Sequence, residues 1–139
     1  RLWVLDLKNR KLLFEEHVAH GQGSGEDIPN AFSNRNGSHQ TSPGLFLTDE
    51  TYEGGNGYSL RLQGLSRGFN ESAMERLIVM HGAPYCPAVR TAVAQPMIDT
   101  LKMGQFIYAY GPGTAKLSSC KTENLSLASV SGLRKANNG

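Results

Sequence analysis

Hydrophobic and polar positions alternate along much of the chain, which is the pattern of β-strands that bury one face. RLWVLDL (1–7) predicts a strand, KNRK a polar turn, and LLFEEHVAHG (12–21) the returning strand of a hairpin. A polar stretch rich in Gly, Ser and Asn (21–44) predicts a surface loop. LFLTDE (45–50) then predicts a short strand, TYEGGNG a turn, and YSLRLQG (58–64) a strand with clean alternation.

Two further segments carry strand patterns in the second half of the chain. RLIVMHG (76–82) is continuously apolar, as expected of a central strand covered on both faces. QFIYAYG (105–111) returns to alternation. With five or six predicted strands and one short helix, the sequence favours a mainly β domain.

The helix is predicted between these two strands, in AVAQPMIDTLKMG. Val93, Met97 and Leu101 are four positions apart, so they share one helical face. Pro96 is expected in the first turn and Gly104 at the end of the helix.

Length and composition narrow the class of protein. The chain has 139 residues, 39% of them hydrophobic and 19% charged, with a net charge of +2, which suits one globular domain. Basic residues are scattered, so no nucleic-acid partner is predicted, and no apolar stretch reaches the ~18 residues of a membrane span. The start at Arg1 suggests a processed N-terminus. We expect a domain over residues 1–113 and a weakly structured tail or linker over 114–139, where no period is evident.

The end of the apolar run at 76–82 carries the residues best suited to catalysis. In HGAPYCPAV, a thiol at Cys86 follows an imidazole at His81. A thiol needs a nearby base to be a strong nucleophile at neutral pH, and imidazole has a suitable pKa. Gly82 permits a sharp turn, and Pro87 restricts the backbone after the cysteine. The alternatives are a buried structural cysteine or a disulfide between Cys86 and Cys120.

Other histidines and glycines give weaker signals. GQGSGE does not fit a dinucleotide-binding loop, because Glu26 occupies the position of the third glycine and no helix pattern follows. His17 and His20 are three apart on a predicted strand and would point to opposite faces. His39 has no evident partner in the sequence. We therefore predict neither a metal nor an organic cofactor.

Several segments resemble the catalytic domain of bacterial murein L,D-transpeptidases (YkuD-like), in the branch whose strand ends in HGA and whose nucleophile lies in GCPAV. They are LWVLDLKNRKLLFEEHVAHG, FSNRNGSHQTSPGLFLTDETYEGGNGYSLRLQGLSRGFN, RLIVMHGAPY, CPAV, QPMIDTLK and FIYAYGPG. They cover residues 1 to about 113. The resemblance implies a YkuD-like β-sandwich with one short α-helix after the catalytic cysteine.

The resemblance also implies a reaction. Such enzymes attack the L-centre carbonyl of a peptidoglycan stem tetrapeptide, expel the terminal D-residue, and pass the acyl group to an amine of a neighbouring stem. Carried over to this chain, Cys86 is the nucleophile and His81 is its base. The Gly82 carbonyl holds the imidazole, and the Cys86 N–H contributes to an oxyanion hole.

The implied substrate also defines partners and location. Tyr52, His39 and Arg61 are expected at the substrate surface from their places in matching loops or on a polar strand face, although structural roles explain them equally well. The implied partners are peptidoglycan stem peptides and, as a covalent inhibitor, a β-lactam of the carbapenem class. We expect the cell envelope as the location, periplasmic or extracellular, with a signal peptide removed. The alternatives are an L,D-carboxypeptidase that uses water as acceptor, and a non-catalytic murein-binding domain with a Cys86–Cys120 disulfide.

The sequence departs from the family between the histidine and the cysteine. Family members carry a longer loop there, with a Ser-x-Gly-type segment just before the cysteine, whereas here APY runs directly into CPAV. Either the loop is omitted from this sequence, or the protein lacks it together with part of its oxyanion hole. The match of the flanking segments favours the first explanation.

Overall fold

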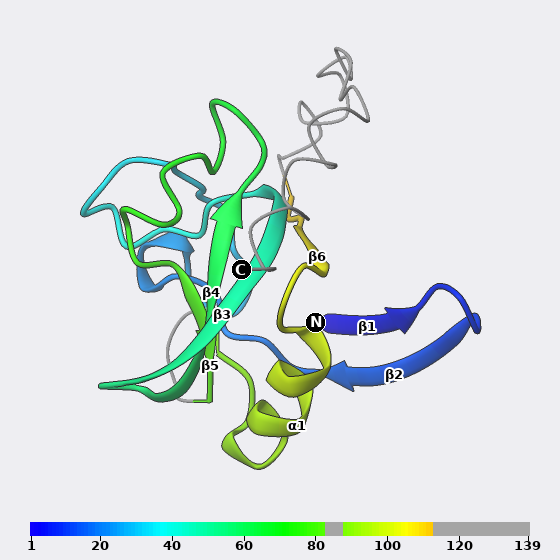
Figure 1. Cartoon of the computed structure of the whole chain (residues 1–139). Coiled ribbons are helices and arrows are strands. Elements are labelled where there is room, and N and C mark those ends of the chain that lie inside the picture. The colour runs from blue at the N-terminus through cyan, green and yellow to red at the C-terminus, as the bar shows by residue number, and fades with distance from the viewer. Residues whose placement is uncertain (83–87, 113–139) are drawn as a thin grey trace, which may run out of the picture.

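The computed structural model describes residues 1–82 and 88–112 (Figure 1). These residues form two antiparallel sheets and one α-helix, so the mainly β prediction is confirmed. A two-stranded sheet projects from the body of the molecule and consists of β1 (Leu2–Asp6) and β2 (Lys11–Glu16). The second sheet, in the order β5-β4-β3-β6, contains β3 (Gly44–Gly54), β4 (Gly57–Gly64), β5 (Val79–His81) and β6 (Phe106–Ala109). A short 3₁₀ turn (Gln22–Ser24) precedes β3, and α1 (Thr91–Leu101) precedes β6.

Strands β3 and β4 form the longest hairpin of the fold. The strand expected at 58–64 is confirmed, but the strand expected at 45–50 was too short, since β3 continues to Gly54. Pairing between Gly54 and Gly57 closes the hairpin, and Gly57 has a positive φ of 77°. A tight turn at positions 55–56 therefore replaces the longer turn expected over TYEGGNG.

Strand β2 ends at Glu16, earlier than the predicted 12–21 segment. The chain beyond it leaves β1, because the Ala19 N–H donates a hydrogen bond of 2.8 Å to the carbonyl of Ala88. The residues after β2 thus pair with the segment that follows β5 instead of extending the hairpin.

The prediction that β5 is a central strand was wrong, because β5 lies at one edge of the four-stranded sheet. All three of its residues are nevertheless buried. Ala88 forms a parallel bridge with His81, and the Val89 N–H donates to the His81 carbonyl at 3.1 Å. These contacts cover the outer edge of β5, which explains a continuously apolar edge strand.

Helix α1 packs on the sheet with the face that the sequence predicts. Met97 and Leu101 are buried, and Val93 packs partly buried against the core. Pro96 was expected in the first turn but is the sixth residue of the helix, where its missing N–H removes one helical hydrogen bond. Gly104, with φ of 92°, follows the helix and donates to the Thr48 carbonyl at 2.9 Å, which leads the chain into β6.

One hydrophobic core joins the four-stranded sheet, α1 and the base of the hairpin. Its buried members are Val4, Phe46, Leu60, Leu62, Ala73, Met80, Val89, Ala94, Met97, Ile98 and Leu101. Among the described residues, no helix has the length and apolarity needed to cross a membrane.

Candidate active site

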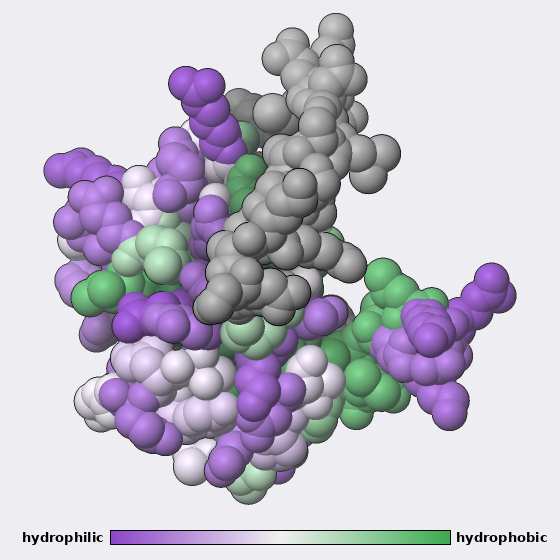
Figure 2. Space-filling model, in the orientation of Figure 1, coloured by the Kyte–Doolittle hydropathy of each residue, from purple (hydrophilic) through white to green (hydrophobic). Residues whose placement is uncertain are grey.

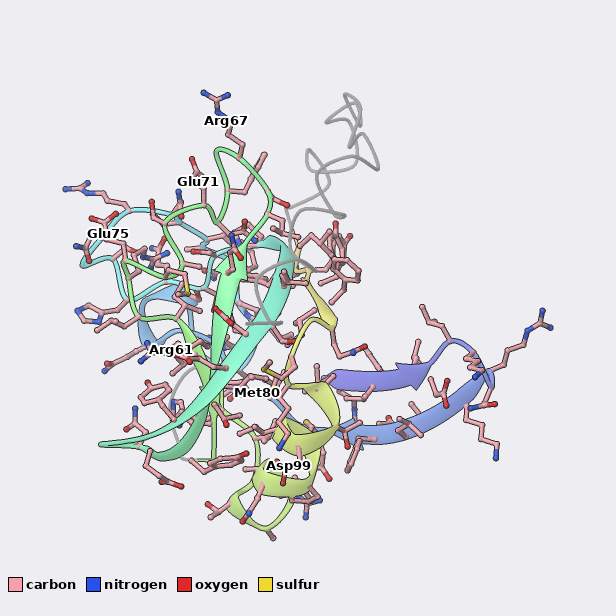
Figure 3. The ribbon with its side chains drawn as sticks, in the orientation of Figure 1. Arg61, Arg67, Glu71, Glu75, Met80 and Asp99 are labelled. Atoms are coloured by element: carbon pink, nitrogen blue, oxygen red, sulfur yellow. The ribbon has the colours of Figure 1, made fainter. Side chains whose placement is uncertain are left out.

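A cavity of about 520 Å³ lies against the four-stranded sheet. Each strand of this sheet contributes at least one apolar residue to its lining, among them Ile107, Phe46, Leu62 and Met80. The strand register places these four side chains on one face, the face that Met80 presents toward α1 in Figure 3. The cavity is also lined by polar side chains, among them His20, His39, Arg76 and His81. It therefore has an apolar floor and several polar groups along its walls.

His81 is the last residue of β5 and lines this cavity while only 3% exposed. Its cross-strand partner in β4 is Ser59, which is 1% exposed. The Ser59 hydroxyl donates to the Gly57 carbonyl at 2.8 Å. The candidate base is thus held at a rigid strand end with a small polar neighbour, and sequence analysis had not identified Ser59 as that neighbour.

Gly82 follows His81 at the point where the chain passes closest to α1. A Cβ atom at this position would lie 2.6 Å from the Ala94 Cβ and 3.1 Å from the Thr91 Cα. The Thr91 hydroxyl also donates to the Gly82 carbonyl at 3.3 Å. The chain bends at Gly82, as the sequence suggested, but the φ of Gly82 lies outside the left-handed region. The close approach of the helix is therefore what requires glycine at this position.

The candidate nucleophile lies outside the described residues. The predictions for Cys86, for its N–H in an oxyanion hole, for the junction after Tyr85 and for a disulfide with Cys120 therefore stay predictions. The described chain stops at Gly82 and resumes at Ala88.

An ion pair between Arg90 and Glu16 holds the chain just after it resumes at Ala88. The Arg90 guanidinium donates from Nε to Glu16 Oε2 at 2.9 Å and from its terminal nitrogen to Oε1 at 2.6 Å. Glu16 is 8% exposed, and its hydrogen bonds and charge interaction with Arg90 hold the pKa of its carboxyl below the ordinary value. The partners are 74 positions apart, so local sequence patterns give no signal for the pair.

The loop that carries His39 is held by a second arginine. His39 has a positive φ of 53°, and its exposed side chain lines the cavity. Arg76 donates to four oxygens of the loop that carries His39. They are the carbonyls of Ser33 (2.7 Å) and Gln40 (2.9 Å) and the hydroxyls of Ser38 (3.1 Å) and Ser42. Arg76 thereby holds residues on both sides of His39, although sequence analysis had not singled it out.

The other two predicted substrate residues contact each other away from the cavity. The Arg61 guanidinium carbon lies 4.3 Å from the centroid of the Tyr52 ring, and Arg61 Nε lies 3.3 Å from Glu50 Oε1. Figure 3 shows Arg61 projecting from the sheet on the side opposite α1. The structure thus brings His39 and His81 to one cavity, whereas Tyr52 and Arg61 form a cation–π pair that does not line it.

His20 also lines the cavity. Its Nδ1 lies 3.0 Å from the Gly21 carbonyl oxygen and its Nε2 lies 2.6 Å from the Glu26 carbonyl oxygen. Both ring nitrogens therefore contact the 20–26 loop, so the ring closes this part of the wall.

Comparison with known protein families identifies the family of this domain. A family model for the L,D-transpeptidase catalytic domain matches residues 1–85, and the chain belongs to this family. The match contains His81 and Gly82 and ends one residue before Cys86, so the resemblance over 86–113 lies outside it. Comparisons with curated proteins and with solved structures gave no match.

Proposed function

We propose that this domain is a peptidoglycan L,D-transpeptidase with Cys86 as nucleophile and His81 as general base. The observation that carries the proposal is the position of His81, which ends a buried strand at the wall of a cavity in a domain of this family. Ala88 and Val89 lie beside His81, and Cys86 stands between His81 and Ala88 in the sequence.

The proposed reaction has two acyl transfers. The imidazole of His81 takes the proton of the Cys86 thiol, and the thiolate attacks the carbonyl carbon of the L-centre. The C–N bond to the terminal D-residue breaks, and the leaving amine takes the proton from the imidazolium. An amine of a second stem then attacks the thioester, loses a proton to His81 and expels the thiolate.

The size and lining of the cavity suit a short peptide. Its apolar floor crosses four strands, which are ~4.8 Å apart, so it is about 14 Å wide. An extended peptide of about four residues has this length. The floor offers apolar contact to small side chains, and His39 and His81 supply polar groups at the walls.

The substrate class carries a proposal on location. Peptidoglycan lies outside the cytoplasmic membrane, so we assign the domain to the cell envelope, periplasmic or extracellular. A β-lactam of the carbapenem class is the expected covalent inhibitor, because its strained carbonyl offers the same target to a thiolate.

The test is incubation of the protein with purified stem tetrapeptide, followed by mass spectrometry. We expect release of the terminal D-residue and formation of a cross-linked dimer. Cys86→Ser and His81→Gln should each lower the rate at least about a thousandfold, as loss of a nucleophile or its base does in other acyl transferases. Tripeptide without dimer would identify water as the acceptor. No release, and no labelling of Cys86 by a carbapenem, would overturn the proposal.

A further inference from the structure

The segment of residues 88–91, which follows the candidate nucleophile in the sequence, connects the end of β5 to the rest of the fold. Three neutral hydrogen bonds join residues 88–91 to earlier parts of the described chain: Ala19 N–H to the Ala88 carbonyl (2.8 Å), Val89 N–H to the His81 carbonyl (3.1 Å) and Thr91 hydroxyl to the Gly82 carbonyl (3.3 Å). Two of these bonds end on the backbone of His81 and Gly82. Segment 88–91 therefore supports the candidate base from the edge of β5 that does not pair with β4.

The strongest side-chain link of this segment is the Arg90–Glu16 pair, which joins it to the last residue of β2. It is bidentate, with contacts of 2.9 and 2.6 Å, and the carboxylate is buried while the guanidinium stays 68% exposed. Charge-assisted hydrogen bonds of this geometry are stronger and more directional than neutral ones. Arg90 is also the residue that precedes α1, and within residues 1–82 and 88–112 no side chain caps this end of the helix.

We propose that Glu16 and Arg90 are positioning residues of the active site, which hold segment 88–91 so that it supports the backbone of His81 and Gly82. This inference rests on the proposed transpeptidase function. The pair acts through the Val89–His81 and Thr91–Gly82 hydrogen bonds and does not itself take part in proton transfer.

The physical case for a catalytic effect comes from the sensitivity of reactions to geometry. A displacement of ~1 Å at reacting groups costs about 100-fold in rate. Removing the pair leaves these three neutral bonds between residues 88–91 and the earlier parts of the described chain, beside the two that the Arg90 carbonyl accepts from the Val93 and Ala94 N–H groups of α1. The imidazole would then move relative to the thiol while the core stays packed.

The chain contains a matched control next to Glu16. Glu15 forms an ion pair with Arg1 at 3.6 Å, and both side chains are about half exposed, at 47% and 49%. Both glutamates lie on β2, and both pair with an arginine. Glu15 does not contact segment 88–91 in the contacts of the described residues. Glu15→Gln therefore removes the same charge without disturbing that segment.

The experiment measures acylation of Cys86 by a carbapenem in the full chain, by intact mass over time and at several inhibitor concentrations. We expect Glu16→Gln to lower the maximal acylation rate constant ten- to a hundredfold with little change in the concentration for half-maximal rate. Arg90→Lys keeps the charge but cannot form two parallel hydrogen bonds, so a smaller loss is expected. Glu15→Gln should react like the unmodified protein.

The two proposals fail in different ways. If the unmodified protein is acylated and Glu16→Gln reacts as fast as Glu15→Gln, the positioning role is overturned while the transpeptidase proposal stands. If the unmodified protein is not acylated, both are overturned. Circular dichroism checks that each variant folds. If Glu16→Gln does not fold, Arg90→Lys is the deciding variant. A maximal acylation rate constant of Arg90→Lys equal to that of the unmodified protein would overturn the inference.

Discussion

Large hydrophobic side chains are exposed in the β1–β2 hairpin but buried in the body of the domain. In the hairpin, Trp3, Leu5 and Leu12 are 56%, 58% and 53% exposed, whereas in the body Leu60 and Met97 are fully buried. Figure 2 shows hydrophobic residues at the surface over the hairpin. Both regions have an alternating pattern, so the pattern alone does not distinguish them.

The difference lies in how many layers each sheet contacts. The four-stranded sheet has α1 packed on one face, and its central strands have neighbours on both edges. The hairpin has two strands, and a two-stranded sheet is marginally stable by itself. It is joined to the core mainly at its base, through Val4 and Glu16. Alternation thus predicts a strand, while burial depends on a neighbouring layer that local sequence does not reveal.

The largest expected effect comes from removing a leucine in each region. Leu60→Ala deletes a fully buried side chain from the core, and we expect a loss of about 3 kcal/mol in the free energy of unfolding. Leu12→Ala removes a side chain that is already half exposed, so we expect a loss below about 1 kcal/mol. Urea unfolding of both variants checks the comparison. Equal losses would show that the hairpin is as well packed as the body.

The same distinction explains how much the sequence could predict. The strand at 58–64, the strand within 105–111 and the helix face at Met97 and Leu101 depend on local periodicity, and these predictions are confirmed. The length of β3 and the edge position of β5 depend on pairing partners, and those predictions were wrong.

The residues of the candidate site likewise fall into those with a local sequence signal and those that only the folded chain brings together. His81 could be identified from its place after an apolar run, and His39 shares its cavity. The Glu16–Arg90 pair joins positions 74 apart, and Arg76 reaches its loop partners across 34 to 43 positions. Such contacts arise from the folded topology, so a single sequence gives no local signal for them.

A second and smaller effect is expected at the joint between the two regions. Hydrogen bonds and charge from Arg90, with smaller contributions from His17 and Arg1, hold the pKa of Glu16 below its ordinary value of 4.5. The pair therefore stabilises the fold above about pH 4.5, and this contribution is lost as the pH falls through the lowered pKa of the folded state. Glu16→Gln should lower the urea midpoint at pH 7 and match the unmodified protein at the most acidic pH at which the protein still folds.

The matched variant sharpens this prediction. Glu15 pairs with Arg1 on the exposed side of the hairpin, so Glu15→Gln should leave the urea midpoint nearly unchanged at both pH values. A deficit of Glu16→Gln that is equally large at both pH values would contradict the ionic explanation, since it would show that packing and not charge holds the joint.

The smallest expected effect on stability comes from the exposed face of β1. Leu5 is 58% exposed and Trp3 lies two positions before it, so both side chains project from one face of the strand. Leu5→Thr introduces a β-branched side chain, which suits a strand, while removing apolar surface. We expect a change in unfolding free energy within about 0.5 kcal/mol and weaker binding of a dye that reports exposed hydrophobic surface. A marked loss of stability would show that this face packs against another part of the protein in solution, and the contrast between hairpin and body would then have to be withdrawn.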